Sequence, residues 1–257
     1  MPGAKVEIKR LTKQFAHGGR TIDVLRGIDL VIDAGERVAV LGASGAGKST
    51  LLQIVGTLDR PTSGSVVFDG QDVGELVGPR LASFRNRTIG FVFQFHHLLP
   101  DFTAEENCAM PALIAGQSRP AALAEARKIL DRVGLSHRLT HRPAELSGGE
   151  QQRVALGRAI ILSPRVLLAD EPTGNLDVET GRQIHDLIDE LNQERGMTMI
   201  VVTHNPSYAE TLPRRVIMKD GRVIDANAPA GATAPSIETS KTAEPGPSPT
   251  ATEVHGA

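Results

Sequence analysis

The chain has 257 residues, enough for one large α/β domain or two small ones, and its apolar share of 40% is ordinary for a globular protein. A net charge of −2 and an aromatic content of 3% argue against a nucleic-acid partner, which needs a basic footprint or base-stacking rings. Cys108, the only cysteine, excludes an internal disulfide and favours a reducing compartment. Neither a signal peptide nor a membrane span of roughly 18 apolar residues is recognisable, so we expect a cytoplasmic protein.

The N-terminal part of the chain alternates between strand patterns and a helix. Apolar and polar residues alternate in the first two segments, and the third has the pattern of a more buried strand that runs into a glycine-rich loop. The strands expected here are Val6–Leu11, Ile28–Ile32, Arg37–Leu41, Ser65–Phe68 and Thr88–Phe93, with a helix over Lys48–Leu58.

The C-terminal part is richer in helix. Residues 95–142 have a helical texture, and the strongest helix propensity lies in Ala121–Val133. The elements expected after this block are a helix from Ser147 to Ser163, a strand over Arg165–Ala169, a helix over Val178–Arg195, a strand over Met199–Val202 and a hairpin over 214–224.

This order of elements predicts an α/β fold with a mainly parallel sheet covered on both faces. We expect one domain over residues 5–225, with a helical subdomain at about 95–145 inserted into it. Residues 226–257 are dominated by Ala, Pro, Thr and Ser. Such a segment cannot bury enough apolar area to offset the entropy of ordering, so we expect a disordered tail.

A complete P-loop pattern follows the third strand. Its glycines let successive backbone N–H groups face phosphates at a helix N-terminus. Lys48 can then reach the β- and γ-phosphates of a nucleotide, and the Ser49 hydroxyl can ligate Mg²⁺. The residues expected to bind nucleotide here are Gly42, Ala43, Ser44, Gly45, Ala46, Gly47, Lys48, Ser49 and Thr50.

Two adjacent carboxylates end the strand predicted at Arg165–Ala169. In a parallel sheet that strand brings them to the carboxyl edge, where the P-loop also lies. We expect Asp170 to bind Mg²⁺ and Glu171 to act as the general base for an attacking water.

The segment Leu146-Ser147-Gly148-Gly149-Glu150 narrows the class of P-loop protein. Ser147 and Glu150 have the spacing of a capping box at the start of a helix. A capping box does not need the two glycines, which cost helix stability. The glycines are expected where a backbone must approach a phosphate closely.

This segment resembles the signature of the ABC ATPase family, and the resemblance covers about residues 5–225. The family implies a P-loop NTPase (RecA-like) core with an antiparallel β subdomain and an inserted α-helical subdomain. It also implies ATP hydrolysis by a homodimer, in which Ser147, Gly148 and Gly149 contact the γ-phosphate of ATP held by the opposite subunit. Four further positions match the family. The resemblance implies that Gln94 is a catalytic residue and Mg²⁺ ligand and that His204 is the catalytic switch histidine. It also implies that Asp177 belongs to the D-loop and that Phe15 stacks on adenine.

Residues 93–107 are similar to the same segment in ATPases of lipoprotein-releasing transporters. That resemblance implies integral membrane subunits as partners, a peripheral position on the cytoplasmic face of the inner membrane, and no direct contact with the lipid cargo. The alternatives are the ATPase of a macrolide-exporter-type or cell-division-type complex and, in another class, a soluble ABC ATPase without a transport role. Because Phe95–Phe102 is unusually apolar, we expect it either to dock the membrane subunits or to fold into the core.

Overall fold

The computed structural model describes residues 3–228, and its centre is a six-stranded sheet in the order β10-β9-β3-β8-β7-β6. β9, β3, β8, β7 and β6 run parallel, and β10 joins the edge antiparallel to β9. The strands are β3 (Arg37–Leu41), β6 (Ile89–Phe93), β7 (Val166–Asp170), β8 (Thr198–Val202), β9 (Arg214–Lys219) and β10 (Arg222–Ala228). The predicted mainly parallel sheet is confirmed.

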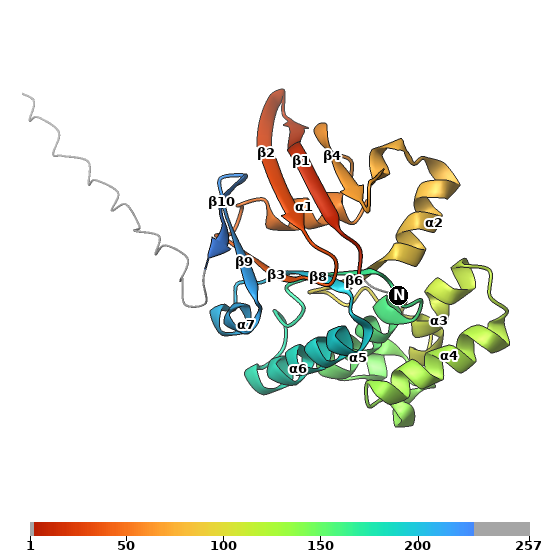
Figure 1. Ribbon diagram of the computed structural model, residues 1–257. Coiled ribbons are helices and arrows are strands. Elements are labelled where there is room, and N and C mark those ends of the chain that lie inside the picture. Colours follow the sequence, from red (N-terminus) through yellow and green to blue (C-terminus); the bar gives the residue numbers. More distant parts are fainter. Residues whose placement is uncertain (1–2, 229–257) are drawn as a thin grey trace, which may run out of the picture.

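A second sheet, antiparallel and of order β2-β1-β4-β5, lies above the central one (Figure 1). Helix α1 (Lys48–Val55) is sandwiched between the two sheets and buries its apolar side against both. The strands are β1 (Val6–His17), β2 (Arg20–Ile32), β4 (Ser63–Phe68) and β5 (Gln71–Asp72). These layers match the antiparallel β subdomain and RecA-like core that the family resemblance implies.

Helices cover the opposite face of the central sheet, where α5 and α6 lie against it and α3 and α4 extend to one side (Figure 1). Three of them begin at side-chain caps: Thr103 for α3, Ser147 for α5 and Asp177 for α6. The helices are α2 (Gly78–Thr88), α3 (Ala104–Ile114), α4 (Arg119–Arg132), α5 (Gly148–Ile160), α6 (Val178–Arg195) and α7 (Pro206–Thr211), with short 3₁₀ turns at Val73–Glu75, Ser136–Arg138 and Pro143–Glu145.

The observed elements differ from the expected ones in several places. β1 and β2 continue well beyond the alternating segments, and β5, α2 and α7 were not predicted. At the C-terminal end, β10 extends to Ala228 through pairing with Arg215 of β9, so residues 226–228 are strand where the sequence suggested a tail. The rest of that predicted tail, residues 229–257, lies outside the described part of the chain.

Candidate active site

The P-loop connects the carboxyl end of β3 to α1. Gly47, the residue before α1, has a φ of 96°, and a Cβ there would lie 2.9 Å from the carbonyl oxygen of Val24. A glycine is therefore required by both the backbone conformation and the space. The Lys48 ammonium group donates to the carbonyl oxygens of Gly42 (2.7 Å) and Ala43 (3.0 Å), so it lies back along the loop. Residues 42–47 thus form a tight turn that ends at a helix N-terminus.

Ser49 and Asp170 meet at this edge of the sheet. The Ser49 hydroxyl donates to Asp170 Oδ1 at 3.2 Å, joining the first turn of α1 to the last residue of β7. Burial raises the pKa of Asp170 above its ordinary value, and the charge of Glu171 adds to this, whereas the Ser49 hydrogen bond and Lys48 lower it. A hydroxyl and a carboxylate oxygen side by side are the hard oxygen donors that suit Mg²⁺.

Glu171 and His204 form the second contact at the same edge. Glu171 Oε2 lies 2.8 Å from His204 Nδ1 and accepts the backbone N–H of His204 at 3.1 Å. Glu171 has a φ of 47°, a left-handed conformation that is strained for a residue with a side chain, and its own N–H donates to Val202. The backbone of Glu171 therefore ties β7 to the end of β8, and its side chain holds His204, two residues after that strand.

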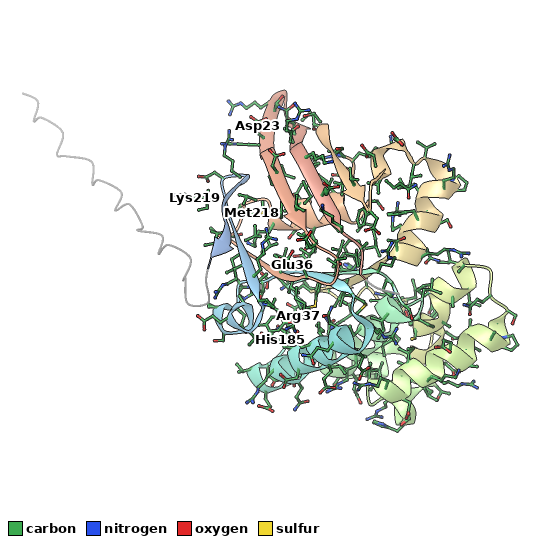
Figure 2. All side chains as sticks on the ribbon, viewed as in Figure 1. Asp23, Glu36, Arg37, His185, Met218 and Lys219 are labelled. Carbon is green, nitrogen blue, oxygen red and sulfur yellow. The ribbon has the colours of Figure 1, made fainter. Side chains whose placement is uncertain are left out.

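Two buried rings support this pair from below the sheet. His185 of α6 stacks on Tyr208 of α7 with ring centroids 3.5 Å apart, and its Nε2 lies 3.0 Å from the Thr173 hydroxyl. Figure 2 shows His185 beneath the central sheet. Burial lowers the pKa of His185 to about 4, so the ring is neutral at physiological pH. The stack thus joins the segment after Glu171 to the helix after His204.

Gln94, the first residue after β6, exchanges two hydrogen bonds with Asn175. Its Nε2 donates to Asn175 Oδ1 at 3.0 Å, and Asn175 Nδ2 donates to the Gln94 carbonyl at 3.2 Å. Gln94 is therefore held by the segment that leads from Glu171 to α6. Sequence reasoning identified Gln94 by resemblance but missed the amide of Asn175 that holds it.

The signature lies at the start of α5. Ser147 accepts the N–H of Glu150, and the Glu150 carboxylate accepts the N–H of Ser147, so the predicted capping box is present. A Cβ on Gly149 would lie 2.5 Å from Thr180 Cγ2. Packing inside one chain thus supplies a reason for this glycine that sequence reasoning, which invoked only phosphate approach, overlooked. Within residues 3–228, the segment 147–149 makes no hydrogen bond to the P-loop.

Asp177 and Phe15 occupy exposed positions away from the paired carboxylates. Asp177 caps α6 by accepting the N–H of Thr180 at 3.0 Å, and hydrogen bonds with the side chain and then the backbone of Thr180 lower the pKa of its carboxyl. Phe15, on β1, is 41% exposed, and the Lys13 ammonium lies 4.8 Å from its ring centroid. The face of the Phe15 ring is therefore already in contact with a cation.

The segment Phe95–Phe102 is divided between surface and core. Phe95 is 65% exposed and Leu99 and Phe102 are also exposed, whereas Leu98 is half-buried against the core. The buried side chain of Asn107 holds this loop: its Nδ2 donates to the carbonyls of Leu99, Phe102 and Thr103, and its Oδ1 accepts the N–H of Leu99. Asn107 is a second residue that sequence reasoning missed.

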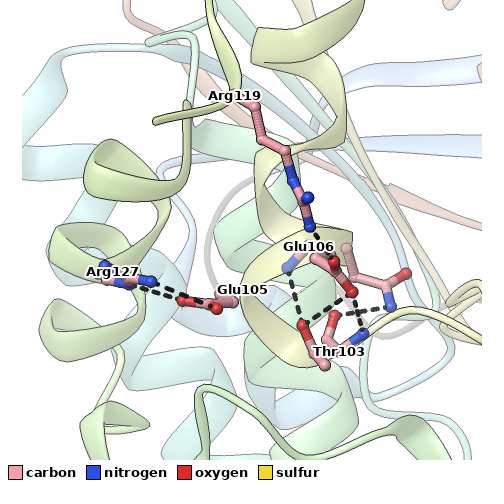
Figure 3. Close-up of polar contacts among 6 residues, drawn as sticks. Thr103, Glu105, Glu106, Arg119 and Arg127 are labelled. Atoms are coloured by element: carbon pink, nitrogen blue, oxygen red, sulfur yellow. Dashed lines mark hydrogen bonds and ion pairs between the residues drawn. The ribbon is translucent and has the colours of Figure 1, made fainter. Parts of the chain in front are cut away.

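Ion pairs fix the helix that carries Asn107. Thr103 and Glu106 form the capping box at the start of α3, and Glu106 also binds Arg119 at 2.7 Å (Figure 3). Glu105 pairs with Arg127 of α4 at 2.6 Å. Both contacts join α3 to the α4 region, so the exposed loop is anchored on a cross-linked helix pair.

Comparison with known proteins decides the family. Residues 25–174 match the family described as ABC transporter. The chain belongs to the ABC transporter family. It is 58% identical to the lipoprotein-releasing system ATP-binding protein LolD of Geobacter metallireducens, over 85% of this chain and 97% of that protein. It is 56% identical to LolD of Myxococcus xanthus, over 87% of this chain and all of that protein.

A solved structure shares the fold. The ATP-binding cassette MJ0796, in a dimeric post-hydrolysis state bound to ADP and Pi, superposes with a TM-score of 0.80 at 40% identity, over 86% of this chain and 97% of that one. The predicted fold class and the assignment to the ABC ATPases, which bind and hydrolyse ATP, are confirmed. None of the helices in residues 3–228 is long and apolar enough to cross a membrane.

Proposed function

We propose that this chain is the ATP-hydrolysing subunit of a transporter that releases lipoproteins from the inner membrane. The observation that carries the proposal is the cluster at the carboxyl edge of the central sheet, where Glu171 contacts His204 and Asp170 contacts Ser49. The likeness to LolD proteins over nearly their whole length supports the transporter class. The macrolide-exporter, cell-division and non-transport alternatives have no comparable support.

The P-loop binds the triphosphate in this proposal. The backbone N–H groups of residues 42–47 and those of Lys48, Ser49 and Thr50 at the start of α1 face the phosphates. The Lys48 ammonium leaves the carbonyls of Gly42 and Ala43 for the β- and γ-phosphate oxygens, whose negative charge attracts it more strongly than the two carbonyl dipoles do. Phe15 offers its ring to the adenine.

The oxygens of Ser49, Asp170 and the Gln94 amide would hold Mg²⁺, which supplies charge neutralisation for the transferring phosphoryl group. Glu171 accepts a proton from the attacking water, since its carboxylate is the one next to Asp170 on the same edge. His204 orients the Glu171 carboxylate through the 2.8 Å contact and can turn toward the γ-phosphate from its exposed position.

Each site is completed by a second copy of the chain. Ser147, Gly148 and Gly149 make no hydrogen bond to the P-loop of their own chain within residues 3–228, yet α5 directs a capped N-terminus outward. We assign these residues, with Asp177, to the nucleotide site of the partner subunit. The dimeric state of MJ0796 supports this arrangement.

Integral membrane subunits bind at the loop that carries Phe95, Leu99 and Phe102. These apolar side chains are exposed while their backbone is fixed by Asn107, which is the pattern of a preformed docking surface. The chain then sits peripherally on the cytoplasmic face of the inner membrane. It moves the membrane subunits by closing and opening the dimer, and does not touch the lipid cargo or nucleic acid.

Reconstitution tests this function. The chain, co-purified with its membrane subunits and placed in lipoprotein-loaded proteoliposomes, should release lipoprotein to an acceptor only with ATP and Mg²⁺. The Glu171→Gln variant in the same complex is the matched control and should release none. ATP hydrolysis by the wild-type complex without any lipoprotein release would contradict the transport role and leave the ATPase assignment standing.

A further inference from the structure

Gln152 lies inside the molecule, between the signature and the catalytic edge of the sheet. It belongs to α5, five residues after Ser147, and its side chain is fully buried. Its amide Nε2 donates to the carbonyl of Pro172 at 2.5 Å and to that of Phe93 at 3.3 Å. Pro172 follows Glu171 and Phe93 precedes Gln94, so one side chain contacts the backbone beside both residues.

Packing alone does not explain an amide at this position. The oxygen Oε1 of Gln152 has no hydrogen-bond partner within residues 3–228. Burial of an unpaired amide oxygen costs stability, and a methionine of similar length would fill the same space without that cost. The amide adds two hydrogen bonds, which its Nε2 donates to the carbonyls of Phe93 and Pro172 in two different segments.

We propose that Gln152 is a positioning residue that couples the signature to Gln94 and Glu171 of the same chain. A helix rises about 1.5 Å per residue and is stiff along its axis, so a displacement of the Phe93 and Pro172 carbonyls is carried by α5 to Ser147, less than two turns away. Under the function proposed above, on which this inference rests, Ser147 serves the nucleotide of the partner subunit. Gln152 therefore links the state of one composite site to the other.

The Gln152→Met variant tests this link. It is compared with a control variant that should lose a similar amount of stability but leave the link intact. The control is Asn192→Leu, since Asn192 is also a buried amide that donates to a backbone carbonyl, that of Met197 at 2.8 Å. That bond joins α6 to the start of β8 and touches none of the proposed site segments. Both variants lose a buried amide hydrogen bond, but only the first loses the connection between α5 and the catalytic edge.

Four quantities are measured for each full-length variant: melting temperature, dissociation constant for ATP, kcat and the Hill coefficient for ATP. Gln152→Met should leave the dissociation constant within about twofold, because the P-loop is untouched, while kcat falls about tenfold or more from misplaced groups. The Hill coefficient should fall from about two toward about one. Asn192→Leu should lower the melting temperature similarly but keep the wild-type kcat and Hill coefficient.

A Gln152→Met variant whose kcat and Hill coefficient equal those of Asn192→Leu overturns the inference and leaves Gln152 a packing residue. If Gln152→Met does not fold, Gln152→Asn replaces it. Its amide is one methylene too short to reach both carbonyls, so an unchanged kcat there overturns the inference equally. Wild-type hydrolysis without cooperativity contradicts the coupling alone, whereas a wild-type chain that hydrolyses no ATP refutes the proposed function as well.

Discussion

The carboxyl edge of the central sheet and the N-terminus of α5 differ in how complete they are within one chain. At the sheet edge, Asp170 contacts Ser49 and Glu171 contacts His204, so four chemically useful side chains are already paired. At the signature, the Ser147 side chain pairs, within residues 3–228, only with Glu150 of its own helix. In the function proposed above, this difference means that one chain preassembles the hydrolytic half of a site and that a second copy supplies the other half.

The largest effect should come from removing the proposed base on the complete side. Glu171→Gln is nearly isosteric, so ATP binding should persist while hydrolysis falls roughly 10²–10⁴-fold. An ATP-bound dimer should accumulate and elute ahead of the monomer on size exclusion. Hydrolysis at a near-normal rate would show that another group takes the proton.

The exposed loop before α3 provides a second test, on a surface that is also incomplete in one chain. Replacing Leu99 and Phe102 with Ser should abolish binding to detergent-solubilised membrane subunits and leave basal ATPase activity within about twofold, because both side chains are exposed. Leu98→Ser is the matched control: it removes a core contact and should lower the melting temperature while folded protein still binds. If the Leu99 and Phe102 variant still binds the membrane subunits while folded Leu98→Ser does not, the docking surface lies elsewhere.

Variants at the signature glycine Gly149 can distinguish two reasons for a glycine there: packing against Thr180 and close approach of the backbone to a phosphate. Gly149→Ala should lower both the melting temperature and hydrolysis, because the new Cβ would lie 2.5 Å from Thr180 Cγ2. Adding Thr180→Ser removes that methyl group and keeps the hydroxyl that hydrogen-bonds Asp177. We expect the double variant to regain the few degrees of melting temperature but not the hydrolysis. Full recovery of both would mean that Gly149 serves packing alone.

The smallest effect is expected at the C-terminal strand. Truncation after Ala228 should leave the melting temperature within about a degree, since the Ala-, Pro- and Thr-rich composition of residues 229–257 offers little apolar area to bury. Truncation after Ile224 removes the pairings of Asp225 with Ile217 and of Ala228 with Arg215, and should lower it by a few degrees. Differential scanning calorimetry decides between the two, and equal melting temperatures would mean that the outer ladder contributes nothing.

Local signals account for the parts of the fold that the sequence predicted well. Arg37–Leu41 and Val178–Arg195 coincide with β3 and α6, because the first is apolar from Val38 onward and the second follows an Asp cap and ends before Gly196. Helix α2 escaped prediction because its apolar side is short: none of its residues is fully buried, and Leu81 and Phe84 are only partly buried. The outer halves of β1 and β2 escaped prediction for a similar reason, because the side chains described there form no buried face.

The site shows the same division. Lys48, Asp170 and Glu171 were predicted because each lies in a short contiguous motif at the end of a predicted strand or in the loop after it. The groups that hold the site, such as Asn107, Gln152 and the ring pair of His185 and Tyr208, act across segments far apart in sequence. Their partners are mostly backbone carbonyls and ring faces, which no residue pattern reveals.

The central claim, that each site needs two copies of the chain, is tested most directly by mixing two inactive variants. Lys48→Ala disables the P-loop of one subunit, and Ser147→Arg blocks the signature of the other. In a mixed dimer both lesions fall in one composite site, and the second site has neither. The account predicts that hydrolysis in the mixture rises well above that of either variant alone. Hydrolysis that stays at the level of the separate variants, together with no crosslink between the P-loop of one subunit and the signature of the other, would contradict it.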